Sequence, residues 1–253
     1  MIRRSGSFPL TLIGAATAIL ACTEIPTGAD EILSVQFNPL PSPSVVVGDS
    51  LRDSLGVVRA PTVTAFNFSG DEVANPPVVF LALDRGIRVD STTGIVTGDS
   101  VRTGARISAR VEGLSVSAQI AVTLRPDSIA RLNVSDSLLY SLLDTLNVSS
   151  AIGVKVFNTT AKVDTAQAVG SYLVSFLVDP ADSIVGRLVA DAGVTRSTLD
   201  TTDASGTASR RVRIDATKLR GQIDSVVVHA FVRYRGAIVG GTPVRLVLKL
   251  KPK

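Results

Sequence analysis

Residues 114–124 read Leu-Ser-Val-Ser-Ala-Gln-Ile-Ala-Val-Thr-Leu, and this stretch decides the fold class. Every second residue is apolar, and most of the residues between them are polar. A period of two is typical of a β-strand that packs one face on a core and turns the other towards solvent. The stretch therefore predicts a half-buried strand rather than a helix.

The residues before this strand predict its partner. Residues 107–111 alternate in the same way, and Glu112-Gly113 separates the two runs. A two-residue connection that ends in glycine is typical of a tight hairpin, because glycine adopts a positive φ at little cost. The sequence therefore predicts a β-hairpin over residues 107–124.

The end of the chain follows a similar plan. Residues 226–234 and 244–250 alternate, and Arg235-Gly236 lies between them as an expected turn. Lys249 and Lys251 occupy the polar face of the last run. We expect these lysines to discourage edge-to-edge pairing of sheets.

Short matches recur in the same order in both halves of the chain, which predicts a diverged tandem duplication. The matched segments are 49–55 with 136–142 (both D-S-L-x-x-S-L), 63–67 with 154–158, and 80–84 with 176–179. Pro126 interrupts strand pairing, so we place the boundary at residues 125–127. The prediction is an all-β protein with one sandwich over residues 32–125 and a second over 126–253.

Composition excludes several classes of function. The 253 residues are 45% hydrophobic and 4% aromatic, with one His, one Cys and no Trp. A His/Cys metal site needs three or four ligands, so we expect no such metal site and no cofactor. The net charge is +4, and Arg3 and Arg4 supply two of these charges outside the predicted sandwiches. Without a concentrated basic surface we expect no nucleic-acid partner.

The N-terminus predicts export. Arg3 and Arg4 precede an apolar run over residues 8–21, which is shorter than the roughly 20 residues that a spanning helix needs. Residues 1–21 are therefore predicted to be a signal peptide. Residues 22–31 contain Pro and Gly without an apolar period and are predicted to be a short tether.

Ile19-Leu20-Ala21-Cys22 resembles a bacterial lipobox, and Cys22 is the single cysteine of the chain. The resemblance implies that the Cys22 sulfur carries a diacylglycerol and becomes the new N-terminus. Thr23, in place of Asp, favours the outer membrane or cell surface. An ordinary signal peptide cleaved near Ala18 or Ala21, or an uncleaved anchor, remains an alternative.

Four segments resemble the bacterial immunoglobulin-like domains of invasins, intimins and other surface proteins. They are V-G-D at 47–49, V-D-S-T-T-G-I-V-T-G at 89–98, G-A-R-I-S-A at 104–109 and T-D-A-S-G-T-A at 202–208. The resemblance implies two tandem immunoglobulin-like β-sandwiches that serve as spacer, stalk or binding module. The second copy departs from the pattern, since it lacks the V-D-x-x-G hairpin.

Two common functional motifs, one for nucleotide binding and one for hydrolysis, are missing from the sequence. It contains neither a G-x-x-x-x-G-K-[ST] loop nor a G-x-S-x-G elbow. His229 is the single imidazole, and we interpret it as a strand residue at a surface or domain contact. Aspartates next to turn residues are expected to bond their own backbone, with calcium binding or acid/base catalysis as alternatives. These are Asp84 with Asp90, Asp179 with Asp182, and Asp200 with Asp203.

Four arginines are a candidate site for an anionic ligand. Arg211 and Arg213 alternate with apolar residues, and Arg233 and Arg235 follow in a later strand. They are either a solvated strand face or a patch for anionic glycans or lipid headgroups.

Together these observations predict a non-catalytic cell-envelope lipoprotein, exported and anchored to the membrane through Cys22. Its tandem sandwiches would act as a spacer or as an interaction module for an extracytoplasmic protein or glycan. An adhesin or glycan-binding surface protein is one alternative. A small hydrolase with an unrecognised carboxylate site is the other.

Overall fold

The structure is a computed structural model that describes residues 31–132, 136–160, 167–219 and 223–253. Strands dominate these residues, and their single helical element is the 3-10 turn η1 (Ala216–Lys218). The prediction of an all-β fold is confirmed. In the same ranges no helix has the length and apolarity to cross a membrane. The predicted signal peptide and Cys22 lie outside the described residues.

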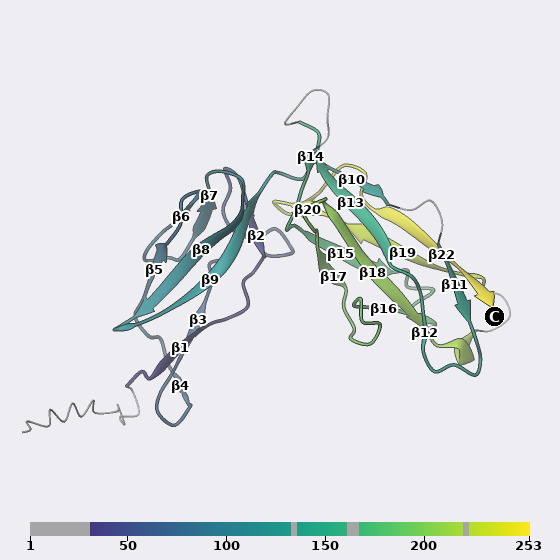
Figure 1. Ribbon diagram of the computed structural model, residues 1–253, viewed down its shortest axis with the longest axis horizontal. Helices are drawn as coiled ribbons and strands as arrows, with labels where there is room; N and C mark the ends of the chain where they lie inside the picture. Colours follow the sequence, from purple (N-terminus) through teal and green to yellow (C-terminus); the bar gives the residue numbers. More distant parts are fainter. Residues whose placement is uncertain (1–30, 133–135, 161–166, 220–222) are drawn as a thin grey trace, which may run out of the picture.

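The strands form two lobes joined end to end (Figure 1). In the first lobe β2, β9, β8 and β5 form one sheet, β1, β3 and β4 a second, and β6 and β7 a hairpin. The bounds are β1 Ser34–Phe37, β2 Ser44–Val46, β3 Val63–Phe66, β4 Glu72–Val73, β5 Val78–Ala82, β6 Ile87–Val89, β7 Val96–Gly98, β8 Arg102–Val111 and β9 Leu114–Thr123.

In the second lobe β11, β22, β19, β15 and β17 form one sheet, and β10, β13, β18 and β12 form another, which β14 and β16 extend. A short hairpin, β20–β21, stands apart. The bounds are β10 Ser128–Arg131, β11 Asp136–Tyr140, β12 Asn147–Val148, β13 Ile152–Asn158, β14 Gln167–Ala168, β15 Leu173–Val178, β16 Gly186–Val189, β17 Leu199–Thr201, β18 Thr207–Ile214, β19 Ser225–Phe231, β20 Arg233–Tyr234, β21 Ala237–Ile238 and β22 Val244–Pro252.

The two lobes share a strand path. The order β2-β9-β8-β5 repeats as β11-β22-β19-β15, with a parallel first pair and antiparallel pairs after it. Strands β3 and β13 occupy equivalent positions, and so do the buried rings of Phe80 and Phe176. This common path supports the predicted duplication.

One sequence match does not join equivalent strands. Residues 136–140 form β11, whereas residues 49–55 follow β2 as a turn segment. The equivalent of β11 is β2, because both pair in parallel with the last strand of their lobe. Both D-S-L segments bury a leucine, Leu51 or Leu138. The sequence match therefore reflects a buried leucine that lies in a strand in the second lobe and in a turn segment in the first.

Both predicted strand pairs are present, but the Arg235-Gly236 turn joins β20 to β21 rather than β19 to β22. Two further details differ from the prediction. Val111 pairs with Leu114, but the residue with positive φ is Glu112, at 53°, and not Gly113. The lysines of β22 do not lie on an edge strand, because β22 is flanked by β11 and β19. β11, near the start of the second lobe, pairs with the edge of β22 for which the sequence predicted no partner strand.

Each lobe has its own aliphatic core. In the first lobe the buried clusters contain residues between Ile32 and Val122, and in the second they contain residues between Ile129 and Leu250. Leu124, at the end of the linker nearest the first lobe, packs on the second core. The change from the first lobe's clusters to the second core therefore lies between Val122 and Leu124, just before the predicted boundary at residues 125–127.

Candidate functional site: the junction between the lobes

The linker between the lobes is bound along the end of β13. The Asn158 side-chain amide donates to the Arg125 carbonyl at 2.8 Å, and the Asp127 amide donates to the Phe157 carbonyl at 3.0 Å. The Asp127 carboxylate also accepts the Thr159 amide at 2.9 Å. These bonds fix residues 125–127 to the second lobe.

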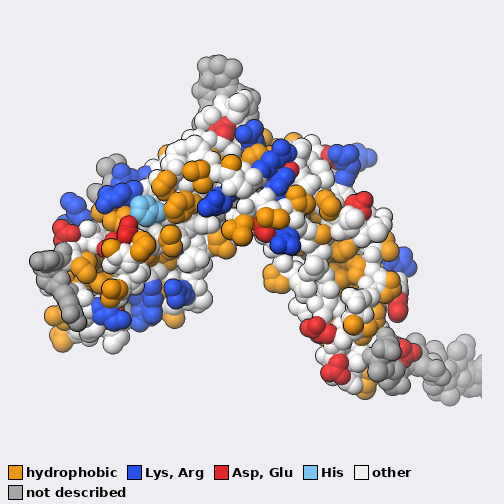
Figure 2. Space-filling view, turned by 180° about the vertical axis from the view of Figure 1, so that it is seen from behind, with side chains coloured by type: hydrophobic (Ala, Val, Ile, Leu, Met, Phe, Trp, Pro, Cys, Tyr) orange, Lys and Arg blue, Asp and Glu red, His pale blue; other side chains and the backbone are white. Residues whose placement is uncertain are grey.

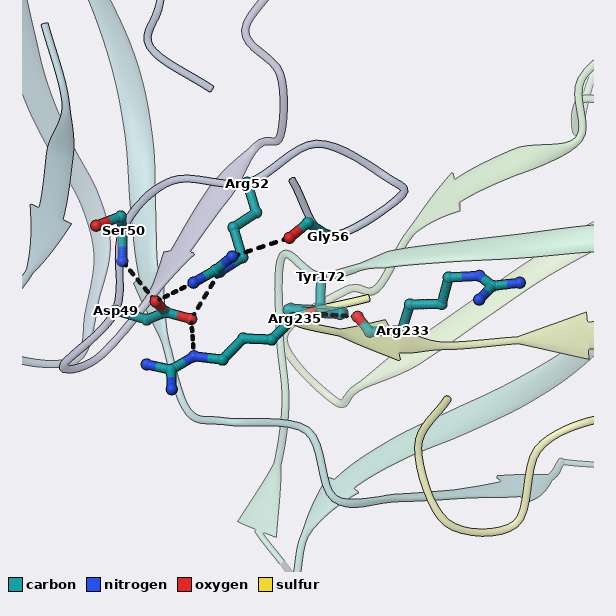
Figure 3. Close-up of polar contacts among 7 residues, drawn as sticks. All are labelled: Asp49, Ser50, Arg52, Gly56, Tyr172, Arg233 and Arg235. Carbon is teal, nitrogen blue, oxygen red and sulfur yellow. Dashed lines mark hydrogen bonds and ion pairs between the residues drawn. The ribbon is translucent and has the colours of Figure 1, made fainter. Parts of the chain in front are cut away.

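Asp49 is the central residue of the junction (Figure 3). It follows β2 at a turn that Gly48 makes possible with a φ of 73°, and its side chain is only 4% exposed. Its carboxylate accepts the Ser50 amide at 2.8 Å and two bonds from Arg52, each at 2.9 Å. A further bond at 3.0 Å comes from Nε of Arg235, in the β20–β21 turn of the other lobe.

The charge of Asp49 is stabilised by these donors. Burial by itself would raise the pKa of this carboxyl group, but the hydrogen bonds from Arg52 and Arg235 outweigh it. The pKa of Asp49 is therefore held well below its usual range. Charge-assisted bonds of this kind are stronger than neutral ones, so Asp49 connects the two lobes at any pH near neutrality.

The backbones of the two lobes also approach each other closely. Gly56 has a φ of 84°, and its carbonyl accepts a bond from Arg52 at 2.9 Å. A Cβ atom added to Gly56 would lie 2.0 Å from the Gly236 nitrogen of the second lobe. Only glycine therefore permits this approach.

Two tyrosines of the second lobe complete the contact. The Tyr172 hydroxyl donates to the Arg233 carbonyl at 2.7 Å. The Tyr234 ring carries the guanidinium groups of Arg125, at 5.0 Å, and Arg235, at 5.4 Å. Burial raises the pKa of both hydroxyls, so they remain protonated.

The space left at the junction is small. The cavity next to Asp49 and Tyr172 has a volume of about 30 Å³. That volume holds water but not a ligand, since ligand sites usually measure ~300–1,000 Å³. The junction is therefore a packed contact rather than a binding pocket.

The structure separates the four arginines that the sequence suggested as an anionic-ligand face. Arg211 and Arg213 lie on β18, whereas Arg233 lies in the β20–β21 hairpin and Arg235 in its turn. The two pairs belong to different sheets, and Arg235 is bound to Asp49. Alternation along a strand could not reveal that β20 leaves the sheet of β19.

The aspartates noted in the sequence are engaged in turns and ion pairs. Asp90, Asp179 and Asp203 accept amide bonds from residues that follow them in turns. Asp182 accepts the Val227 amide at 2.7 Å. The ion pairs are Asp84 with Arg106, at 3.0 Å, and Asp200 with Arg210, at 2.8 Å.

His229 has an acidic neighbour that sequence reasoning missed. Its Nε2 atom lies 3.4 Å from an Asp179 oxygen, and its ring is tilted against Phe231 at 6.4 Å. No hydroxyl or thiol within the described ranges hydrogen-bonds the imidazole, so no nucleophile completes a catalytic set there. In those ranges, too, no three His, Cys, Asp or Glu side chains gather as a metal ion would require.

Comparisons with known proteins add similar folds but no family. No family model and no curated protein matches the chain. Domains 4 and 5 of the S-layer protein SbsC are 13% identical with a TM-score of 0.32, covering 87% of this chain and 98% of that one. EC1-2 of human protocadherin-24 is 14% identical with a TM-score of 0.29, covering 88% of this chain and 100% of that one. Similarity at this level assigns neither a family nor a ligand.

Proposed function

We propose that this protein is a non-catalytic spacer and interaction module of the cell envelope, whose two sandwiches are held in a fixed relation. The observation that carries the proposal is the nearly buried, ionised Asp49, which binds arginines of both lobes. A linker without such contacts would leave the lobes free to reorient, which is the usual behaviour of domains with small interfaces.

The position of the chain ends agrees with a spacer. The described chain enters at the far end of the first lobe, and its C-terminal strand ends at the far end of the second (Figure 1). A module built in this way separates whatever is attached at its two ends. The length it spans is defined only if the junction is stiff.

The aspartates and His229 favour a role without catalysis. The aspartates are occupied by turns or by arginine, and the imidazole faces a carboxylate without a nucleophile in the described part of the chain. These groups stabilise turns of the backbone and ion pairs on the surfaces of the lobes.

Location follows from the N-terminal sequence. We propose that Cys22 carries a lipid and holds the protein at the outer membrane or cell surface, since the preceding residues resemble a lipobox. Labelled palmitate should enter the wild-type protein, and Cys22→Ser should move it from the membrane to the soluble fraction. Unlabelled wild type, together with an unchanged membrane fraction for the variant, would reject the anchor.

The spacer role is tested by small-angle X-ray scattering of two paired variants. Asp49→Ala with Arg235→Ala removes the ion pair between the lobes, and Asp84→Ala with Arg106→Ala removes one within the first lobe. We expect the first variant to show a larger mean radius of gyration and a broader distribution of interatomic distances than the wild type. The second variant should match the wild type in both. Wild-type scattering that already requires freely reorienting lobes would reject a stiff spacer.

A further inference from the structure

A groove on the second lobe, distant in sequence from the junction, has the dimensions of a ligand site. It lies between the loop after β11, the residues on either side of β16, and the end of β18 with η1. Its volume of about 590 Å³ is within the range of ~300–1,000 Å³ that is common for ligand sites. It is therefore much larger than the cavity at the junction.

Arginines without acidic partners line this groove. Arg187 of β16 stands directly opposite Arg213 of β18 in the antiparallel ladder, and Arg196 also lines the groove. Like charges directly opposite each other on a sheet destabilise it. In the described part of the chain no carboxylate forms an ion pair with any of the three.

The acids of the groove are already engaged. Asp144 pairs with Lys253 at 2.7 Å, and Asp215 pairs with Lys218 at 3.5 Å. The uncompensated charge of the groove is therefore positive. A bound anion would relieve the repulsion between Arg187 and Arg213.

Large aliphatic side chains surround these arginines. Leu142, Leu143, Leu177 and Ile184 line the groove, and all four are more than half exposed, with Leu143 at 94%. Basic and hydrophobic side chains gather together at the lower end of the second lobe in Figure 2. Exposed apolar side chains grouped around polar ones are typical of a binding surface.

We propose that this groove binds an acidic peptide segment of a partner protein, with carboxylates on Arg187, Arg196 and Arg213 and aliphatic side chains on the surrounding leucines. Arginine binds carboxylates through two parallel hydrogen bonds, which suits a row of acidic side chains. The proposal depends on neither the lipid anchor nor the stiffness of the junction.

The shape of the groove favours a peptide over a membrane surface. Arg213 is only partly exposed, and it donates to the Thr145 carbonyl at 3.1 Å, so its guanidinium lies against the wall. A flat bilayer contacts protruding groups, whereas a peptide side chain reaches into a hollow.

Fluorescence anisotropy with a labelled peptide in which aspartate alternates with leucine tests the proposal on the full chain. We expect binding at low salt that weakens as salt is added. The double variant Arg187→Gln with Arg213→Gln should weaken binding about tenfold or more. Arg245→Gln with Lys249→Gln removes the same charge from β22 and should change the affinity less than about twofold.

Two further measurements distinguish a loss of peptide binding from a loss of folding. Because it removes a like-charge pair, Arg187→Gln with Arg213→Gln should leave the unfolding midpoint unchanged or slightly higher. Leu143→Ser should also weaken the peptide, since it removes apolar contact at an exposed site that the fold does not need.

Three outcomes would overturn the proposal. The first is no binding of the acidic peptide at low salt. The second is equal binding by the groove variant and the β22 variant. The third is binding to phosphatidylglycerol vesicles, lost in the groove variant, without peptide binding, which would assign the groove to a membrane surface.

Discussion

Asp49 keeps its charge in a position that is 4% exposed, while its partner in the other lobe, Arg235, is 53% exposed. This difference predicts unequal effects of removing either side chain. Asp49→Asn leaves two guanidinium groups without a carboxylate and should lower the free energy of unfolding by about 3 kcal/mol. Arg235→Gln removes a half-exposed group that water can replace and should cost clearly less than Asp49→Asn. Urea denaturation measures both, and equal losses would contradict this description.

The low pKa of Asp49 makes the junction sensitive to acid. The unfolded carboxyl group has a pKa of about 4, and the folded one lies lower because of Arg52 and Arg235. A depressed folded pKa stabilises the protein fully above about pH 4, and this stabilisation is lost as the pH falls below that value. The free energy of unfolding should therefore fall less steeply with acid in Asp49→Asn than in the wild type. If the free energy of unfolding fell equally steeply with acid in both proteins, protonation of Asp49 would not be what weakens the contact.

At the scale of elements, the turn at Gly56 is predicted to set how closely the lobes approach. Gly56→Ala adds a Cβ to a residue with a φ of 84° and places it against the Gly236 backbone. Gly70→Ala is a matched control, since Gly70 has a φ of 83° and no atom within 4 Å of an added Cβ. Both variants should lose about 1 kcal/mol through backbone strain. Only Gly56→Ala should also change the X-ray scattering profile, and a change in both or in neither would contradict the prediction.

The elements that sequence predicted best are those with local signals. The alternation of residues 114–124 predicted β9. The resemblance of V-D-S-T-T-G-I-V-T-G to the immunoglobulin-like hairpin implied β6–β7, in which Asp90 accepts amide bonds from the turn and Gly94 has a φ of 72°. Periodicity and turn residues act over a few positions, so a single sequence contains them.

The contacts that sequence missed depend on distant partners. Asp49 and Arg235 are 186 positions apart, and their pairing requires the lobes to dock first. The V-G-D and R-G motifs predicted turns at Asp49 and Arg235, but they did not predict that these two residues contact each other. Likewise, the place of β22 inside its sheet depends on β11, which pairs with it in parallel from the start of the lobe.

At the scale of the whole molecule, the separate aliphatic clusters of the two lobes are connected by a short bound linker, an ion-paired carboxylate and a glycine contact. None of these contacts is large, but each involves a different part of the junction: the linker, the Asp49 carboxylate and the Gly56 backbone. Their combination is the basis for the central claim that the two lobes form a stiff unit.

Pulsed electron paramagnetic resonance between one spin label in each lobe tests that claim most directly. Ser115→Cys and Lys249→Cys are exposed sites on β9 and β22, and Cys22→Ser removes the native thiol. We predict a single narrow distance distribution that broadens when Asp49→Asn is added. A broad distribution in the parent protein, unchanged by Asp49→Asn, would contradict a stiff junction.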